Sequence, residues 1–360
     1  MNELIVIGGG IIGMLTAREL AVSGRQVMLL ERGRTGKESS WAGGGILSPL
    51  YPWRYEEPVT RLAQWSQRHY EALAGELTSE TGIDPEYTCS GLLMLGLEPS
   101  ELEQAKAWAD EFNYHIEPVQ ADKLSQIQSG LGVFESDSLW MPEIAQVRNP
   151  RLVQALRQSI ESLGVRVLEN HPVDEVLVKS GEVIGVRSGE TEFPAPEVVV
   201  CGGAWSELLV ESAGCSAGVY PVKGQMLLYK GDSGLLKRIV LADNHYLIPR
   251  RDGHILVGST MENAGFDKTT TQEARAELQA AAETILPGLA RYPLVKQWAG
   301  LRPGRARGIP CISGHPDIEG LYVNAGHFRN GVVTGLASAR LMADLILRRS
   351  PILAPEDFAL

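Results

Sequence analysis

Residues 4–13 read LIVIGGGIIG, and this stretch decides the fold. The apolar run 4–7 is typical of a strand that is buried on both faces of a sheet. The following residues carry apolar side chains at helical spacing and stop at Gly24, which predicts a helix with a glycine terminator. Residues 27–30 predict a second buried strand, which ends at the acidic Glu31. Strand, glycine turn, helix and strand in this order are typical of a dinucleotide-binding unit.

The glycines of this turn each have a physical task. Gly8 permits the tight turn, Gly10 lets a pyrophosphate approach the backbone, and Gly13 allows the helix to pack closely on the strand. The helix N-terminus then faces the phosphates with unpaired N–H groups and the positive end of its dipole. Glu31, 18 residues beyond Gly13, is placed to accept hydrogen bonds from ribose hydroxyls and disfavours a 2′-phosphate.

A small-residue segment after Glu31 bears on the choice between NAD and FAD, which share this fingerprint. Residues 36–46 read GKESSWAGGGI, where a nicotinamide-binding domain would continue its regular alternation of strands and helices. Small residues let a large flat ligand come close, and the hydroxyls of Ser39 and Ser40 can bond phosphate oxygens. The segment favours FAD, and a disordered glycine loop is the alternative.

Composition bounds the class of protein. At 360 residues, 44% of them hydrophobic, the chain is expected to form two domains around a sizeable core. Its net charge of −11 argues against a nucleic-acid partner, since phosphate binding needs a basic face. No run approaches the roughly 20 apolar residues of a membrane span, and Met1-Asn2-Glu3 lacks the positive flank of a signal peptide. These features predict a cytoplasmic protein without a membrane span.

Cysteine and histidine patterns give no sign of a metal. The four cysteines are scattered without a CxxC pair, and the seven histidines do not cluster, so we expect neither a metal site nor a disulfide framework.

The rest of the chain alternates between helical and strand-like segments without an internal repeat or a linker. Helices are predicted for residues 57–80, 100–112, 149–163, 271–286 and 332–347, and strands for 91–97, 165–167, 197–201 and 320–326, with a hairpin at 173–186 and several strands within 220–257. We therefore expect an α/β fold, α+β overall, in which a Rossmann-like FAD-binding domain is interleaved with a substrate domain built on an antiparallel sheet.

With these segments in hand, the whole chain resembles the D-amino acid oxidase superfamily of FAD-dependent amine oxidoreductases, and most closely its glycine-oxidising branch. Seven ordered segments carry the resemblance: residues 6–13 with Glu31, 39–47, 221–224, 245–250, 257–261, 298–304 and 325–331. The resemblance implies an FAD-binding domain made of residues 1–85, 141–219 and 298–360, and a substrate-binding domain made of residues 86–140 and 220–297.

The same resemblance assigns candidate substrate residues. It implies that Arg302 holds the substrate carboxylate, that Tyr246 hydrogen-bonds it, that Arg329 borders the site and that Met261 lines the pocket. A planar guanidinium suits a carboxylate because it can bond both oxygens and stays charged. From the residues alone, Arg302 could equally be an exposed loop arginine, Tyr246 a core residue and Arg329 a loop-stabilising residue.

FAD is expected to bind without a covalent link. Some relatives attach flavin through a cysteine near the segment that holds Cys311, but the residues around Cys311 match the glycine-oxidising branch better. Trp41 and the glycines at 43–45 depart from a stretch that is often rich in Ser and Ala, which leaves the pocket width open. The expected cofactor contacts are Gly8, Gly10, Ile11, Ile12, Gly13, Glu31, Arg32, Ser39, Ser40, Gly44, Gly45, Ile46, Val173, His327, Phe328, Arg329, Asn330, Gly331, Val332 and Val333.

The activity that the resemblance implies is oxidative deamination of glycine and other small amines or D-amino acids, such as sarcosine and D-alanine. O2 would reoxidise the flavin, giving hydrogen peroxide, ammonia and a keto acid, and the imine would serve thiamine thiazole synthesis. A homotetramer is expected on the same ground. Two alternatives stay open: a D-amino acid dehydrogenase that passes electrons to another carrier, and an FAD-binding protein that modifies tRNA or is purely structural.

Overall fold

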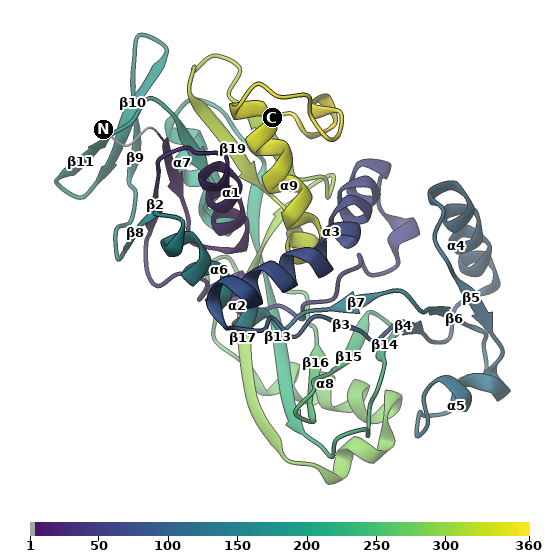
Figure 1. Cartoon of the computed structure of the whole chain (residues 1–360). Coiled ribbons are helices and arrows are strands. Elements are labelled where there is room, and N and C mark those ends of the chain that lie inside the picture. Colours follow the sequence, from purple (N-terminus) through teal and green to yellow (C-terminus); the bar gives the residue numbers. More distant parts are fainter. Residues whose placement is uncertain (1–3) are drawn as a thin grey trace.

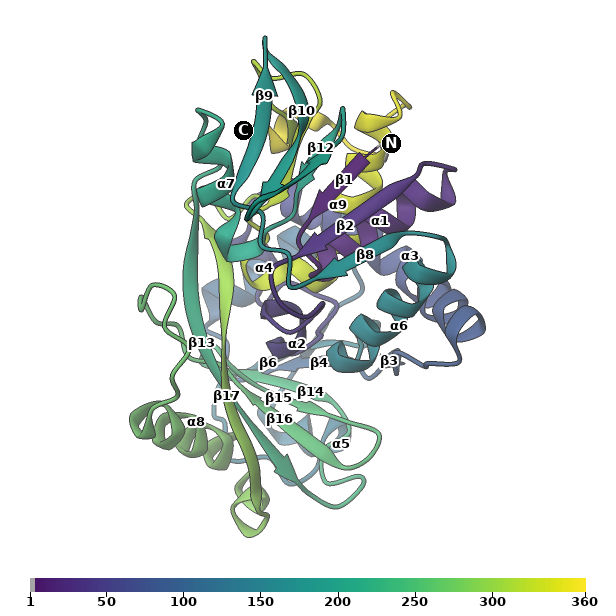
Figure 2. The ribbon, with the colours of Figure 1, turned by 90° about the vertical axis from the view of Figure 1, so that its left-hand side faces the viewer.

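Two sheets, one above the other, organise the molecule in Figure 1, where the nucleotide unit lies in the upper part. The computed structural model describes residues 4–360. Two long paired strands, β13 (Val219–Lys230) and β17 (Leu294–Arg305), run from the lower part up to the nucleotide unit (Figure 2). The two parts therefore share elements and are not simply tethered.

The upper sheet has six strands in the order β18-β19-β12-β1-β2-β8, all parallel except β18. β1 lies inside this sheet, with Val6 in the core on one face and Ile5 in the core on the other. Burial on both faces explains why its sequence is a continuous apolar run. The strands are β1 (Leu4–Ile7), β2 (Val27–Glu31), β8 (Arg166–Glu169), β12 (Val198–Val200), β18 (Cys311–Gly314) and β19 (Leu321–Ala325). Five of them confirm predicted strands, and β18 is the strand that the sequence did not predict.

Four helices form one layer against this sheet. They are α1 (Ile11–Val22), α3 (Glu57–Thr81), α6 (Asn149–Ser162) and α9 (Gly331–Ile346), all confirming predicted helices. α1 and α9 pack closely because Gly335 presents no side chain to Ile12 and Leu15; an added Cβ would lie 3.1 and 3.3 Å from them. The other face is covered by α7 (Ser206–Ser212) and an antiparallel sheet, β9 (Glu175–Lys179), β10 (Glu182–Ser188) and β11 (Thr191–Pro194), which contains the predicted hairpin.

The lower sheet has eight strands in the order β17-β13-β16-β15-β14-β4-β6-β5. It is antiparallel, as expected, except where β4 pairs in parallel with β14. α4 (Pro99–Phe112) packs on one face and α8 (Gln272–Ile285) on the other, each with its own apolar core. The remaining strands are β4 (Leu92–Met94), β5 (Glu117–Val119), β6 (Ser138–Met141), β14 (Ile239–Ala242), β15 (His245–Pro249) and β16 (His254–Gly258).

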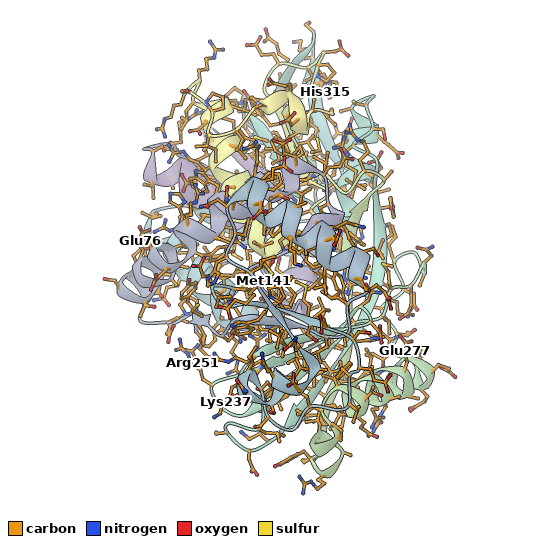
Figure 3. The ribbon with its side chains drawn as sticks, turned by 90° about the vertical axis from the view of Figure 1, so that its right-hand side faces the viewer. Glu76, Met141, Lys237, Arg251, Glu277 and His315 are labelled. Carbon is orange, nitrogen blue, oxygen red and sulfur yellow. The ribbon has the colours of Figure 1, made fainter. Side chains whose placement is uncertain are left out.

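The remaining elements are short. They are α2 (Ser39–Ala42), the two-stranded pair β3 (Thr88–Cys89) and β7 (Ala145–Gln146), and α5 (Leu124–Ile127), which packs against the core of the lower sheet. Figure 3 shows Met141, at the end of β6, in the middle of the molecule, while Glu76 and Glu277 lie at its rim. Within residues 4–360, no helix is long and apolar enough to cross a bilayer. The predicted domain boundary at residue 298 falls inside β17, and the division into domains stays a prediction.

Candidate active site

A cavity of about 460 Å³ runs between the two sheets. One end lies where β1 and β2 end, at Ile7 and Glu31, and the other lies at Tyr246 and Arg302. Ligands of parallel α/β sheets bind at this carboxyl edge, and the volume is typical of small-molecule sites. The cavity brings together residues that are 215 to 295 positions apart in the sequence, from Glu31 with Tyr246 to Ile7 with Arg302.

The glycine turn forms the first end of the cavity and has the geometry that the sequence predicts. Gly8 has φ +106°, and an added Cβ would lie 2.4 Å from the Cys201 carbonyl oxygen. At Gly13 a Cβ would lie 1.9 Å from the Gly8 carbonyl oxygen, so this glycine serves the contact between α1 and β1. The Ile11 amide donates to Ser40 Oγ at 2.8 Å, which joins the start of α1 to the small-residue segment.

Glu31 lies at the edge of this turn and is 7% exposed. Its carboxylate accepts hydrogen bonds from the Gly9 amide (2.7 Å) and the Gly33 amide (2.8 Å). These bonds fix a negative charge on the cavity wall beside the N-terminus of α1, where ribose hydroxyls are expected.

The small-residue segment lies in the middle of the cavity. At Gly44 an added Cβ would lie 2.7 Å from Ile248 Cδ1 and 3.3 Å from the Tyr246 ring. At Gly45, which has φ +77°, it would lie 2.1 Å from the Val147 carbonyl oxygen. The segment is ordered, so the disordered-loop alternative is wrong. Its glycines allow Ile248, Tyr246 and the Val147 carbonyl to approach closely, and its backbone lines the cavity.

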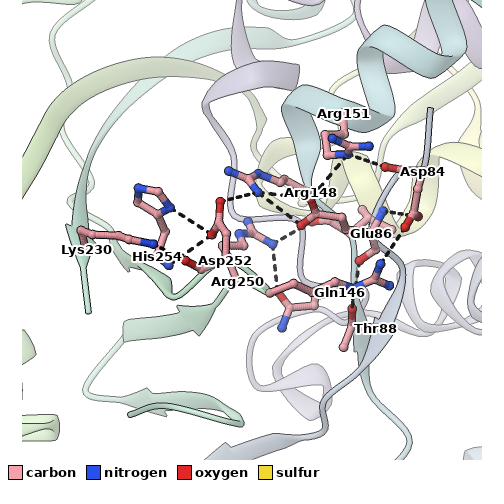
Figure 4. A network of polar contacts seen from close by, with 12 residues as sticks. Asp84, Glu86, Thr88, Gln146, Arg148, Arg151, Lys230, Arg250, Asp252 and His254 are labelled. Carbon is pink, nitrogen blue, oxygen red and sulfur yellow. Dashed lines mark hydrogen bonds and ion pairs between the residues drawn. The ribbon is translucent and has the colours of Figure 1, made fainter. Parts of the chain in front are cut away.

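Arg250, to which the sequence analysis assigns no role, holds this segment in place. Its Nη2 donates to the Gly44 carbonyl at 2.6 Å, and its Nη1 donates to the Val147 carbonyl at 3.0 Å and to Gln146 Oε1 at 2.8 Å. Burial lowers the pKa of Arg250 to about 10, so the side chain stays charged at neutral pH. Figure 4 shows it next to a chain of ion pairs in which Arg148 bonds both Glu86 and Asp252.

Arg302 points from β17 into the other end of the cavity. Its Nη2 donates to Ser259 Oγ at 2.7 Å, and its Nη1 donates to the carbonyl of Thr260 at 3.2 Å and more weakly to that of Lys223 at 3.4 Å. Gly224 makes room for it, because a Cβ there would lie 2.1 Å from Nη1. Burial lowers the pKa of Arg302, and the charge of the nearby Arg329 acts in the same direction.

The guanidinium of Arg302 therefore has neutral partners. Among residues 4–360, no carboxylate forms an ion pair with it, although most of its surface is removed from water. A buried cation without a counter-ion is costly unless an anion arrives to pair with it. The arrangement indicates an anionic ligand and excludes the interpretation of Arg302 as an exposed loop arginine.

Tyr246 lies beside Arg302 and is 7% exposed. Its hydroxyl donates to Met226 Sδ at 3.3 Å, which is a weak acceptor, and it also interacts with the Arg302 guanidinium. Gly258 lies against the ring, since a Cβ there would be 2.8 Å away. The hydroxyl thus lies at the cavity surface, where it can donate its hydrogen bond to a ligand that is a stronger acceptor than Met226.

Arg329 also lines the cavity, and its Nε is buried without a hydrogen-bond partner among the described residues. Its Nη2 lies 3.3 Å from Met261 Sδ. Met261 itself is 61% exposed and does not line the cavity. Arg302 and Arg329 therefore both line the cavity, whereas Met261 lies outside it.

His327, in the loop before α9, is 2% exposed, and its Nε2 lies 3.0 Å from Ser338 Oγ. Burial lowers the pKa of His327 to about 3, so the ring is neutral at physiological pH. Val333, farther along, is buried in the core of α9 and does not line the cavity. The other expected cofactor contacts, apart from Gly13, do line it.

Several cavity residues were missed by sequence reasoning. They come from loops and strand positions that carry no motif of their own, apart from Gly224 and Ser259, which lie in segments that carry the family resemblance. The missed lining residues include Glu38, Ser48, Leu50, His171, Asp174, Trp205, Gly224, Met226 and Ser259.

The residues present fit a flavin dinucleotide. The N-terminus of α1 and the carboxylate of Glu31 match a pyrophosphate and a ribose, and the cavity continues from there past the backbone of Gly44 to Arg302, where a flat ring would lie. Fold and cavity together indicate the class, a flavin-dependent oxidoreductase. The chain belongs to the family described as FAD dependent oxidoreductase, whose model matches residues 3–345, and FAD is its cofactor.

Individual relatives agree with this family. A glycine oxidase from Pseudomonas aeruginosa is 47% identical, with 99% of this chain and 98% of the relative covered. A glycine oxidase from Pseudomonas putida is 44% identical, with 99% of this chain and 98% of the relative covered. The crystal structure of glycine oxidase from Geobacillus kaustophilus superposes with a TM-score of 0.94 at 28% identity, covering 99% of this chain and 98% of that one.

Proposed function

We propose that this protein is a glycine oxidase. It catalyses the FAD-dependent oxidative deamination of glycine and of other small amines or D-amino acids, with O2 as electron acceptor and with keto acid, ammonia and hydrogen peroxide as products. The observation that carries this proposal is the largely buried guanidinium of Arg302, which has no carboxylate partner among residues 4–360 and lies beside Tyr246 at the cavity end next to Gly44. The curated relatives named glycine oxidase support the choice of glycine.

In this proposal Arg302 binds the substrate carboxylate through both oxygens. Tyr246 turns its hydroxyl from Met226 to the same carboxylate, and Arg329 borders the site and adds positive charge. FAD, when bound, would supply the two-electron redox chemistry that couples oxidation of the substrate to reduction of O2. The protein orients the substrate's α-carbon and excludes water. His327 is neutral and bonded to Ser338, so no proton transfer is assigned to it.

The domain division and the mode of FAD binding belong to the same proposal. Residues 1–85, 141–219 and 298–360 bind FAD, and residues 86–140 and 220–297 cover the substrate. FAD binds without a covalent link. This is supported by Cys311, whose side chain is buried outside the lining of the cavity and whose thiol pKa burial raises to about 11.

The cellular setting is also proposed. The enzyme works in the cytoplasm as a homotetramer and supplies imine for thiazole synthesis in the thiamine pathway, as the family resemblance implies. Relatives named "Bifunctional protein ThiO/ThiG" support the last point, since one from Synechocystis is 30% identical over 99% of this chain and 54% of its own length.

Peroxide release under air tests the activity. Purified protein is given glycine, sarcosine and D-alanine in parallel, and hydrogen peroxide is measured with each, together with ammonia from glycine and D-alanine and methylamine from sarcosine. We expect peroxide with each substrate and the highest kcat/KM with glycine. Substrate-dependent reduction of a quinone or dye without peroxide would instead show the dehydrogenase alternative, and no turnover of any amine would contradict the proposal.

A further inference from the structure

A loop of the substrate side reaches across to the nucleotide end of the cavity. It comprises residues 259–271 between β16 and α8, and we call it the strap. Its first residues, Ser259 and Thr260, bond Arg302 as described above. Its middle, around Phe266, is exposed and carries no motif that the function uses. In Figure 2 the strap is the loop above α8, beside the long strand β13.

A buried lysine fixes the course of the strap. Lys223 on β13 has a side chain only 3% exposed, and its Nζ pairs with Glu262 at 3.4 Å and with Asp267 at 3.2 Å. Asp267 also accepts hydrogen bonds from the Thr269 amide (3.0 Å) and hydroxyl (2.8 Å). These contacts fix the backbone at Asp267 and therefore the positions of its neighbours Phe266 and Lys268.

Those two neighbours both contact the nucleotide end. Phe266 stacks on Trp205, with ring centroids 5.2 Å apart and an interplanar angle of 24°. Lys268 pairs with both oxygens of Glu38, at 2.9 and 3.0 Å. Trp205 and Glu38 line the cavity, whereas Phe266 and Lys268 do not.

Arg32 contacts both Trp205 and Glu38. Its guanidinium carbon lies 3.7 Å from the centre of the Trp205 ring, on which Phe266 also stacks. Its Nη2 also lies 3.4 Å from Glu38 Oε1. Arg32 follows the ribose-facing Glu31 directly and also lines the cavity. Cation–π and stacked aromatic contacts of this kind add to the burial of the rings themselves.

We propose that Phe266 and Lys268 form a clasp that retains FAD by holding Trp205, Arg32 and Glu38 closed over the nucleotide end of the cavity. Both residues are positioning residues that act through the cavity wall. A ligand leaves slowly when the groups around it must separate first, so loosening the clasp speeds dissociation with little effect on chemistry at the far end. The inference concerns the cofactor and does not depend on glycine being the substrate.

The test measures FAD release from the holoenzyme by the rise in flavin fluorescence after dilution. We expect Phe266→Ala to release FAD at least tenfold faster than the native chain, Lys268→Gln to release it severalfold faster, and Phe266→Trp to stay near the native rate because stacking is kept. Val295→Ala, which truncates a 52% exposed apolar residue on β17, and Lys237→Gln, which removes an exposed charge, are matched controls that should leave release unchanged.

The melting temperature of the apoprotein distinguishes a clasp from general packing. A clasp predicts that Phe266→Ala leaves the apoprotein melting temperature unchanged and reduces only the extra stability that FAD confers. The KM for glycine, measured with saturating FAD, should also stay the same. A native FAD release rate in Phe266→Ala would overturn the proposal, as would faster release accompanied by an equal loss of apoprotein stability.

Discussion

At the scale of single residues, the site depends on a guanidinium whose protein partners are all neutral. We expect Arg302→Ala to raise the KM for glycine by at least about 100-fold, because charge-assisted bonds to a carboxylate contribute roughly 2–4 kcal/mol in a dry site. FAD should remain bound, since Arg302 lies at the far end of the cavity from the glycine turn. Steady-state kinetics and the flavin absorption spectrum measure both effects.

Arg307→Ala is the matched control for this change. Arg307 is exposed and pairs with Glu56 at the surface, so its loss should leave KM and the spectrum unchanged. A near-native KM in Arg302→Ala would sink the carboxylate assignment, whatever the control does.

Tyr246 makes a second prediction at this scale. In the structure its hydroxyl donates to the weak acceptor Met226 Sδ and interacts with the Arg302 guanidinium. We expect Tyr246→Phe to lower kcat/KM for glycine by about tenfold or less, which corresponds to one hydrogen bond of roughly 1 kcal/mol. Loss of several orders of magnitude would show that the hydroxyl takes part in the reaction and does not merely position the substrate.

At the scale of elements, the small-residue segment at residues 36–46 is held by Arg250, which bonds the Gly44 carbonyl, and by close packing of Gly45 on the Val147 carbonyl. We expect Gly45→Ala to destabilise the protein by more than about 2 kcal/mol, because its φ of +77° disfavours a side chain and the new Cβ would meet the Val147 carbonyl. Gly75→Ala is the matched control: Gly75 lies inside α3 with open space around it, so alanine should stabilise by up to about 1 kcal/mol. Urea unfolding of both variants measures the difference, and equal stabilities would contradict the role given to the segment.

Elements with a strong local pattern were predictable from the sequence. β1, α1 and β2 follow from apolar periodicity and glycine placement within 28 residues, and the hairpin of β9 and β10 follows from alternation around one turn. The structural role of Arg250 was not predictable, because its partner Gly44 is 206 residues away and the contact depends on packing of both parts. Met261 ends a matching segment, yet the chain has already left β16 at Gly258 and turned that side chain outward.

At the scale of the whole molecule, His327 makes stability depend on pH. Burial lowers its pKa to about 3, whereas an unfolded histidine titrates near 6.5, so between these values the unfolded chain binds the extra proton. The free energy of unfolding should therefore fall as the pH drops below about 6.5, by up to roughly 1.4 kcal/mol per pH unit. Carboxylates with lowered pKa values, such as Glu262, reduce the free energy of unfolding further only below about pH 4.5.

The change in the free energy of unfolding between pH 7 and pH 5 isolates the contribution of His327. We expect the native chain to lose about 2 kcal/mol over this range, and His327→Gln to lose much less, even though the variant is less stable at pH 7. Parallel pH profiles for the two proteins would show that the unfolding equilibrium does not depend on this ring.

The strand pair of β13 and β17 constrains how this protein can be recombined with its relatives. Because both strands run from the lower sheet to the edge of the nucleotide unit, a chimaera joined at either strand would place one parent's strand against the other parent's. Their register of eleven paired positions, from Val219 with Arg305 to Tyr229 with Leu294, would then have to match across parents. Exchange of substrate preference between such enzymes should accordingly move both strands together with the lower sheet, leaving the glycine turn with its own parent.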